Sequence, residues 1–458
     1  WDSFSVGQGN TVNFVQPSAN AVALNRVLGS DVSVIQGAIN ANGQVFLLNP
    51  NGVLFSPTAQ VNVGALMAST LNMSTQDFMN GNYKLTGDSS NAVINQGNIT
   101  AVGDAGKGGV IALIAAKVIN EGNLTANSGN VLLGAGSEVV LDLGGPVKLQ
   151  VTQGAIDALV QNSGAIQADG GLIYLTAQAV NTLTAATINN TGVIRAQTLA
   201  TGEKGEIRLM ADMVSGTANV GGTLDASAPN GGNGGFIETS GNTVHVSDTA
   251  QVTTLADRGQ TGQWLIDPNN YTIAASGGNQ TGAQVATSLN TTSVTIQTST
   301  MGTSGGSGDI FVNDNITKTG TSGATTLTLQ AERNIDVNAN ITSTGSALNI
   351  TLSAANSPTG TVGGVHLQAS KSLSSNGGNI LIGGSGGNSV PLLSSGGIGF
   401  ALNFSSSEAA INIDQSTTIN SNGGLIVLNG YTNLAPSGSP KGQYAGVWVQ
   451  GGALISSG

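Results

Sequence analysis

The sequence contains no cysteine and only two histidines, His245 and His366, among its 458 residues. Without cysteine, the chain has no disulfide framework, no cysteine-ligated zinc and no thiol nucleophile. Two histidines that are far apart in the sequence give no basis for a multi-histidine metal site. We therefore predict that the protein is not an enzyme and that it has no catalytic residue, no metal site and no cofactor.

Charged residues are also scarce, at 8% of the chain, and the 13 Lys and Arg are outnumbered by 24 Asp and Glu. A net charge of −11 disfavours nucleic acid and anionic membrane surfaces as partners. No apolar run approaches the roughly 18–20 residues that span a bilayer, so we predict no membrane-spanning segment. The N-terminus, from Trp1 to Phe4, lacks the basic and apolar regions of a signal peptide.

Glycine and asparagine are abundant instead, with 68 and 47 residues. Hydrophobic residues make up 39% of the chain, which is enough to bury a core, although aromatic residues are only 4%. A large ordinary core is hard to fill with so few aromatic side chains. This composition favours a repeat of small units, each with a narrow aliphatic interior.

An internal repeat is present, and its clearest copies are 25 residues apart. Ile94–Ala101 (INQGNITA) returns as Ile119–Ala126 (INEGNLTA), and Val312–Thr317 (VNDNIT) returns as Val337–Thr342 (VNANIT). Weaker copies begin at Val160 and Ile188. Short alternating segments between Gly and Asn turns predict β-strands, and coils of this length predict an all-β parallel solenoid. Asn side chains can form hydrogen-bonded ladders between successive coils.

Three segments depart from the repeat. Helix signals are sparse, and the best of them, at residues 282–290, predicts a short helix between coils. Residues 139–157, which contain Gly144-Gly145-Pro146, and residues 431–449 predict extra-helical insertions, the first of them as a hairpin.

The first seventy-five residues carry a more specific series of motifs. An apolar strand leads into Asn49-Pro50-Asn51-Gly52, where Pro presets φ and Gly allows positive φ in a turn. The ordered blocks are Trp1–Gly7, Val12–Pro17, Leu24–Val27, Ile35–Ile39, Gly43–Phe55 and Ala68–Leu71.

This series resembles the secretion domain of two-partner secretion exoproteins, the family of filamentous haemagglutinin, the high-molecular-weight adhesins and the haem–haemopexin utilisation proteins. The resemblance implies a right-handed parallel β-helix with an N-terminal capping region, exported through the outer membrane by a dedicated β-barrel transporter. It also implies that Asn49, Pro50, Asn51 and Gly52, with Asn25 and Arg26, take part in transporter recognition. The tetrapeptide either contacts the transporter or builds the turn that shapes the contact surface, and Arg26 alternatively closes a local network.

A second match to the family lies at Gly234–Gly241 and Gly262–Pro268. We therefore predict a secretion domain over 1–245 and a β-helical shaft over 246–458 that continues the same solenoid. Family members start before the Trp1 position and are far longer, so we expect a monomeric N-terminal fragment of a larger exoprotein.

The resemblance favours a secreted, surface-exposed adhesin whose partner is a host receptor or a biofilm exopolysaccharide. One alternative is a haem-acquisition protein that binds a haem carrier through loops inserted between coils, with 139–157 as the best candidate. Another is the stalk of a contact-dependent growth-inhibition toxin. The Gly-x-Ser-x-Gly matches at 302–306 and 383–387 lack the following helix of a nucleophile elbow, and we predict no catalysis there.

Overall fold

The computed structural model describes residues 1–104, 108–142, 148–299, 307–357, 362–385, 398–405, 408–432 and 445–458. Its contacts define two compact units, the first formed by Trp1–Gly241 and Ala250–Gly262, and the second by Asn242–Thr249 and Gln263–Gly458. The predicted boundary between residues 245 and 246 falls inside the short segment 242–249.

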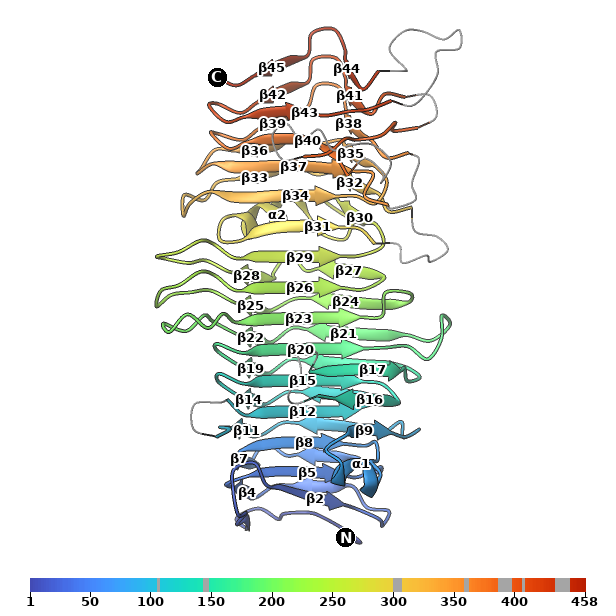
Figure 1. The fold of residues 1–458 in the computed structure, drawn as a ribbon, viewed down its shortest axis with the longest axis vertical. Coiled ribbons are helices and arrows are strands. Elements are labelled where there is room, and N and C mark those ends of the chain that lie inside the picture. The colour runs from blue at the N-terminus through green and yellow to red at the C-terminus, as the bar shows by residue number, and fades with distance from the viewer. Residues whose placement is uncertain are drawn as a thin grey trace. The chain divides into compact units, whose positions relative to one another are not determined.

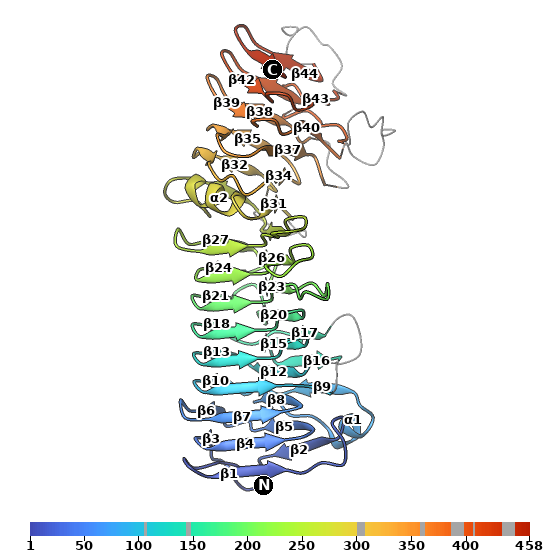
Figure 2. The same cartoon turned by 90° about the vertical axis from the view of Figure 1, so that its left-hand side faces the viewer.

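The first unit is a coil of three rows of parallel strands (Figures 1 and 2). The β1 row contains β1 (Thr11–Phe14), β4 (Ala38–Ala41), β7 (Gln60–Val63), β11 (Asn98–Ala101), β14 (Asn123–Thr125), β19 (Ala165–Gln167), β22 (Val193–Arg195), β25 (Thr223–Asp225) and β28 (Gln251–Thr253). The β3 row contains β3 (Ser33–Ile35), β6 (Val53–Phe55), β10 (Ala92–Asn95), β13 (Lys117–Asn120), β18 (Ala158–Asn162), β21 (Ala186–Asn190) and β24 (Gly216–Val220). The β2 row contains β2 (Val22–Arg26), β5 (Gln44–Leu48), β8 (Ala65–Ser69), β12 (Val110–Ala115), β15 (Asn130–Ala135), β20 (Leu172–Ala177), β23 (Glu206–Ala211) and β26 (Phe236–Ser240).

The pairing follows the sequence repeat. Ile94 pairs with Ile119, and Ile99 with Leu124, so the 25-residue offset is one turn of the coil. Alternate residues point inward, where Val118 and Leu124 are almost completely buried. The predicted parallel β-helix is confirmed.

A second apolar layer lies outside the coil, against the outer side of the β2 row (Figures 1 and 2). It is built by α1 (Thr75–Met79) and by an antiparallel sheet of β9 (Tyr83–Thr86), β16 (Glu138–Leu141) and β17 (Leu149–Gln153). β16 and β17 form the hairpin predicted within 139–157, and β9 adds a third strand. Because this layer covers β12 and β15, both faces of these two strands are buried.

Glycine allows the hairpin to lie close to the coil. A Cβ on Gly136 would stand 2.3 Å from Cγ1 of Val151 and 2.8 Å from the carbonyl oxygen of Gln153. We predict that Gly136→Val displaces the hairpin and lowers the free energy of unfolding by about 1–3 kcal/mol. Urea unfolding and proteolysis of the hairpin measure this effect. Gly451→Val is the control, because a Cβ there meets nothing within 4 Å; equal effects of the two variants would contradict the prediction.

The second unit repeats the three-row coil. One row contains β29 (Gln263–Asp267), β31 (Ser293–Gln297), β34 (Thr325–Gln330), β37 (Leu348–Ala354), β40 (Ile380–Gly384) and β43 (Ile426–Leu428). Another contains β30 (Tyr271–Ile273), β32 (Ile310–Val312), β35 (Ile335–Val337), β38 (Val365–Leu367), β41 (Ile411–Ile413) and β44 (Val447–Val449). The third contains β33 (Ile316–Lys318), β36 (Ile341–Ser343), β39 (Ser372–Ser374), β42 (Thr418–Asn420) and β45 (Leu454–Ser456). This unit also holds β27 (Thr243–Val246) and α2 (Gly282–Leu289).

The predicted helix over 282–290 is confirmed as α2, which begins after Thr281, whose side chain accepts from the backbone N–H of Gln284. Trp264 and Tyr271 are completely buried in this unit, and the Tyr271 hydroxyl donates to Oε1 of Gln280 at 2.8 Å.

Most of the predicted insertion at 431–449 lies outside the described residues, as do residues 302–306 and 386–387 of the two Gly-x-Ser-x-Gly matches.

A lysine occupies an interior position of the second unit. The Lys318 side chain is fully buried, and its Nζ donates to the carbonyl oxygens of Gly320, Gly323 and Ser346 at 3.2–3.3 Å and to the Ser346 hydroxyl. Burial lowers the pKa of Lys318, because removing the ammonium group from water disfavours its charged form.

We predict that Lys318→Met lowers the free energy of unfolding by about 2–4 kcal/mol at pH 7, because buried carbonyl groups lose their donor. The folded-state pKa lies below the unfolded-state value, so the wild type gains stability as the pH rises between the two values. The Met variant lacks this gain. Urea unfolding at pH 7 and pH 10 measures both effects. If the free energy of unfolding changed equally with pH in the wild type and in Lys318→Met, the lowered pKa of Lys318 would be contradicted.

Candidate functional site

The Asn49–Gly52 tetrapeptide forms a tight turn between β5 and β6. The backbone N–H of Gly52 donates to the carbonyl oxygen of Asn49 at 3.0 Å, and Gly52 has a φ of +118°. This is the positive φ that the sequence predicts for this glycine. Pro50 is exposed at the tip of the turn, and its carbonyl oxygen accepts from Oγ of Ser89 and Nδ2 of Asn91 at 2.6 and 2.9 Å.

Asn49 has no exposed surface, and both ends of its amide are used inside the protein. Its Oδ1 accepts from the backbone N–H and from Nδ2 of Asn51, at 2.9 and 3.0 Å. Its Nδ2 donates to the carbonyl oxygen of Asp31 and to Oγ of Ser33, both at 2.9 Å. Asn51 in turn donates to the carbonyl oxygen of Gly29 at 2.8 Å. Asn49 and Asn51 therefore hold the neighbouring loop between β2 and β3.

Asn25 and Arg26 lie at the end of β2, immediately before this loop. Asn25 is buried; its Oδ1 accepts from Nε1 of Trp1 at 3.1 Å, and its Nδ2 donates to the carbonyl oxygen of Phe46 at 3.3 Å. Arg26 donates from Nε to Oδ1 of Asn72 at 3.1 Å and from Nη2 to the carbonyl oxygen of Met73 at 2.6 Å. The local network considered for Arg26 is therefore present.

Four of the six predicted residues, Asn25, Arg26, Asn49 and Asn51, border or bond to one segment, residues 27–33, which we call the β2–β3 loop. Asn25 and Arg26 precede the loop at the end of β2, Asn51 bonds to Gly29 within it, and Asn49 bonds to Asp31 and Ser33 near its end. The loop exposes two aliphatic side chains, Leu28 and Val32, at 77% and 45%. Since the side chains of Asn25, Asn49 and Asn51 are used internally, the surface available to a partner is the loop and Pro50.

Comparisons with known proteins indicate the kind of domain to which this site belongs. Residues 1–223 match the family model of the TPS secretion domain. The chain is also 38% identical over 186 residues to a heme/hemopexin-binding protein of Haemophilus influenzae strain Rd, covering 40% of this chain and 20% of that protein.

The chain carries the secretion domain of a two-partner secretion exoprotein.

Two further similarities accompany this domain. A second Haemophilus influenzae heme/hemopexin-binding protein is 44% identical to the exoprotein over 86 residues, which cover 19% of this chain and 9% of that protein. The crystal structure of the HMW1 secretion domain from the same species covers 98% of this chain and 91% of its own, with a TM-score of 0.51 and 20% identity, and shows the shared β-helix fold. The exoprotein thus spans about a fifth or less of the curated relatives' length.

The secretion domain implies secretion from the cell and a partner transporter in the outer membrane. Within the described ranges, no helix has both the length and the apolar character to cross a membrane. The role of Asn25, Arg26 and Asn49–Gly52 in transporter recognition stays a prediction. The β2–β3 loop was missed by sequence reasoning, although its exposed Leu28 and Val32 stand between two recognised motif blocks.

The two histidines of the exoprotein have different surroundings. His245 is exposed on β27. His366 packs edge-on to Phe404, with Nε2 3.1 Å from Oδ2 of Asp414 and Nδ1 3.9 Å from Oδ1 of Asp336. In the part of the chain that the structure describes, no three His, Asp or Glu side chains are grouped to hold a metal ion.

Proposed function

We propose that this exoprotein is a surface-exposed adhesin that attaches the bacterium to host cells or to biofilm exopolysaccharide. Support comes from rows of asparagine side chains on the outside of the coil, which are hydrogen-bonded from one strand to the next. In the β1 row, Asn40 donates to Asn13 at 3.1 Å, and Asn123 donates to Asn98 at 2.7 Å. In the second unit, the half-buried Asn338 donates to Asn313 at 2.8 Å. Such rows offer repeated amide donors and acceptors to an uncharged polymer.

We further propose that the exoprotein binds and does not catalyse. The aliphatic interior holds the coil together, and many of its charged side chains pair across neighbouring strands or turns, as Arg195 does with Asp169 and Arg333 with Asp309. These pairs fix the outer surface. Catalysis would instead require such charges to act together with a nucleophile or a base on a bound substrate.

The second candidate function is haem acquisition, which the names of the Haemophilus influenzae relatives favour. The described residues of 139–157, the loop that best fitted this role, fold back onto the coil. Val139 and Leu149 on its two strands are almost completely buried against the β2 row, so the described part of this hairpin does not protrude as a free loop. We therefore place adhesion first.

The test is attachment of the purified chain, coupled to beads, to epithelial cells, to films of exopolysaccharide and to immobilised hemopexin. We expect saturable attachment to the cells or to the polysaccharide. Beads that carry an unrelated β-helical protein serve as the control. Attachment to hemopexin alone would overturn the adhesin proposal and favour haem acquisition.

A further inference from the structure

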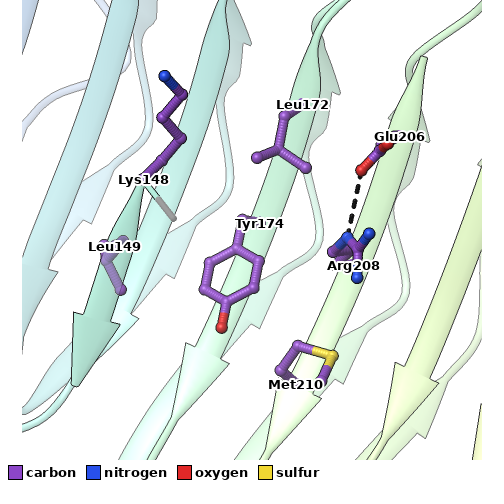
Figure 3. Close-up of a pocket in the computed structure, with 7 residues that line it drawn as sticks. All are labelled: Lys148, Leu149, Leu172, Tyr174, Glu206, Arg208 and Met210. Atoms are coloured by element: carbon purple, nitrogen blue, oxygen red, sulfur yellow. Dashed lines mark hydrogen bonds and ion pairs between the residues drawn. The ribbon is translucent and has the colours of Figure 1, made fainter. Parts of the chain in front are cut away.

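A cavity of about 330 Å³ lies on the outer side of the first unit, where the β16–β17 hairpin ends (Figure 3). Its volume is at the lower end of the range for small-molecule sites, roughly 300–1,000 Å³. The outward side chains of β12 and β15 are mostly buried beneath the hairpin, whereas those that β20 and β23 contribute to the cavity are only partly buried. Lys148 and Leu149 of the hairpin form one wall of the cavity, and the outward side chains of β20 and β23 form its floor.

The register of the strands sets this floor. Tyr174 of β20 pairs with Arg208 of β23, and Leu172 pairs with Glu206. Because side chains alternate along a strand, these four point outward together, while Ile173 between them is fully buried. The floor therefore consists of one aromatic ring, one aliphatic side chain and one ion pair.

Arg208 is held in a fixed orientation. Its Nε donates to Glu206 at 3.2 Å, its Nη1 donates to Glu238 at 2.5 Å, and its guanidinium lies 5.1 Å from the centre of the Phe236 ring. A guanidinium carries five N–H donors, and among the described residues Nη2 has no protein acceptor. Donors that are already oriented lose little entropy when they bind a ligand.

Tyr174 supplies the apolar part of the floor. Its ring is seen face-on in Figure 3, between Leu149 of the hairpin and Arg208 of the next strand. The side chain is half-buried, and burial raises the pKa of the Tyr174 hydroxyl, which therefore stays protonated at neutral pH. Met210 extends the apolar wall beside the ring.

From this cavity we infer a binding subsite for one pyranose ring of a glycan, with the C–H face of the sugar stacked on Tyr174 and its hydroxyl groups bonded to Arg208, Glu206 and Lys148. A pyranose ring has an apolar face and a polar rim, and this floor has the same division. The positive charges of Lys148 and Arg208 are balanced by Glu206 and Glu238, which disfavours a multiply charged ligand. The inference rests on the proposed adhesive function and names the chemical class of its ligand.

Titration of the full chain with methyl pyranosides, followed by ligand-observed NMR and calorimetry, tests the subsite. The panel contains neutral hexosides, N-acetylhexosaminides and hexuronates. We expect saturable binding of at least one neutral pyranoside. Binding of the matching hexuronate at least as tightly would support a contact between its carboxylate and Lys148 or Nη2 of Arg208.

Tyr174→Ala and Arg208→Met are expected to weaken this binding by at least about tenfold, whereas Tyr174→Phe retains the ring and most of the affinity. Arg195→Met is the matched control, because Arg195 is similarly exposed and pairs with Asp169 on a different row. Circular dichroism checks that each variant is folded. No saturable binding by the wild type, or equal binding by Tyr174→Ala and Tyr174→Phe, would overturn the inference.

Attachment assays with the same variants separate the two proposals. If the wild type attaches to cells or polysaccharide but binds no pyranoside, the subsite is wrong and the adhesive function stands. If it binds a pyranoside and attaches to neither surface, the subsite stands and the adhesive function is wrong.

Discussion

Replacing Asn120 by Leu is expected to lower the free energy of unfolding of the first unit by about 3–5 kcal/mol. Asn120 is the second member of a buried ladder of asparagine side chains at the ends of strands in the β3 row. Nδ2 of each residue donates to Oδ1 of the next, from Asn95 to Asn120 at 2.8 Å, to Asn162 at 2.7 Å and to Asn190 at 2.8 Å. The last member, Asn190, donates to the carbonyl oxygen of Gly221 at 2.7 Å.

Leucine matches asparagine in size but can neither accept from Asn95 nor donate to Asn162. Because all of these amides are essentially inaccessible to water, the two neighbours are left with unmade hydrogen bonds. The cost therefore exceeds that of a single surface hydrogen bond. Loss of the ladder is also expected to propagate locally, since each coil contacts only the coils next to it.

Urea unfolding of the full chain, together with amide hydrogen exchange at β13, measures the effect. Asn123→Leu is the matched control, because Asn123 lies in the same coil and bonds to Asn98 at 2.7 Å in an exposed ladder. We expect it to change stability by less than about 1 kcal/mol. If the two variants were equally destabilised, the buried ladder would not be the stabilising element that we describe.

Replacing Asn49 by Ala is expected to reduce secretion strongly and to weaken binding of the transporter's periplasmic domains by more than about tenfold. The substitution removes four hydrogen bonds of one fully buried amide, two of which hold the carbonyl group of Asp31 and the hydroxyl group of Ser33. The β2–β3 loop then loses its fixed shape. Its exposed Leu28 and Val32 lose their defined positions, and the surface offered to a transporter changes although none of its side chains has been replaced.

Pro50→Ala separates the two roles considered for the tetrapeptide. Pro50 is the exposed residue of the turn. Its backbone carbonyl oxygen, which the substitution retains, accepts hydrogen bonds from Ser89 and Asn91. If the turn acts by shaping the loop, Pro50→Ala retains secretion and Asn49→Ala does not. Secreted protein per cell and the Kd for the periplasmic domains are the two measurements. Loss of binding in Pro50→Ala, with Asn49→Ala unaffected, would indicate direct contact through the proline instead.

The coil itself could be predicted because its units are local. The 25-residue offset between Ile94 and Ile119 is one turn of the β-helix, and the same holds for Val312 and Val337. Other turns differ in length: Val110 pairs with Asn130, 20 residues later, whereas Ile380 pairs with Ile426, 46 residues later. Insertions at the corners of the coil leave the strand pairing unchanged, so a fixed period describes only some of the turns.

The outer layer of the first unit could not be predicted as a whole, since it joins β9 to β16 across more than fifty residues of sequence. A signal for it was nevertheless present. The run from Val110 to Ala115 is apolar at every position, as in strands buried on both faces, and does not alternate as a strand with one face in water does.

Asparagine was expected in the turns between strands and in hydrogen-bonded ladders between coils. Asn376 and Asn422 lie between strands with φ of 48° and 50°. The repeated asparagines at 95, 120, 162 and 190 instead place their amides in the buried ladder. Side-chain hydrogen bonding between coils, and not backbone conformation, explains their recurrence.

For the candidate site, the sequence predicted a set of residues but not what their side chains contact. The resemblance pointed to Asn25, Arg26 and the Asn49–Gly52 turn, and these surround one loop. That the asparagine side chains bond internally, leaving the β2–β3 loop on the surface, depends on contacts between neighbouring coils that sequence spacing does not reveal.

The central claim, that the chain leaves the cell by two-partner secretion, is tested most directly by expressing it with and without its outer-membrane transporter in the same cells. The amount of folded chain in the medium is then measured. We predict that the chain appears outside only when the transporter is present, and that Asn49→Ala is retained in the cell under the same conditions. Equal amounts of wild-type chain in the medium with and without the transporter would contradict the account.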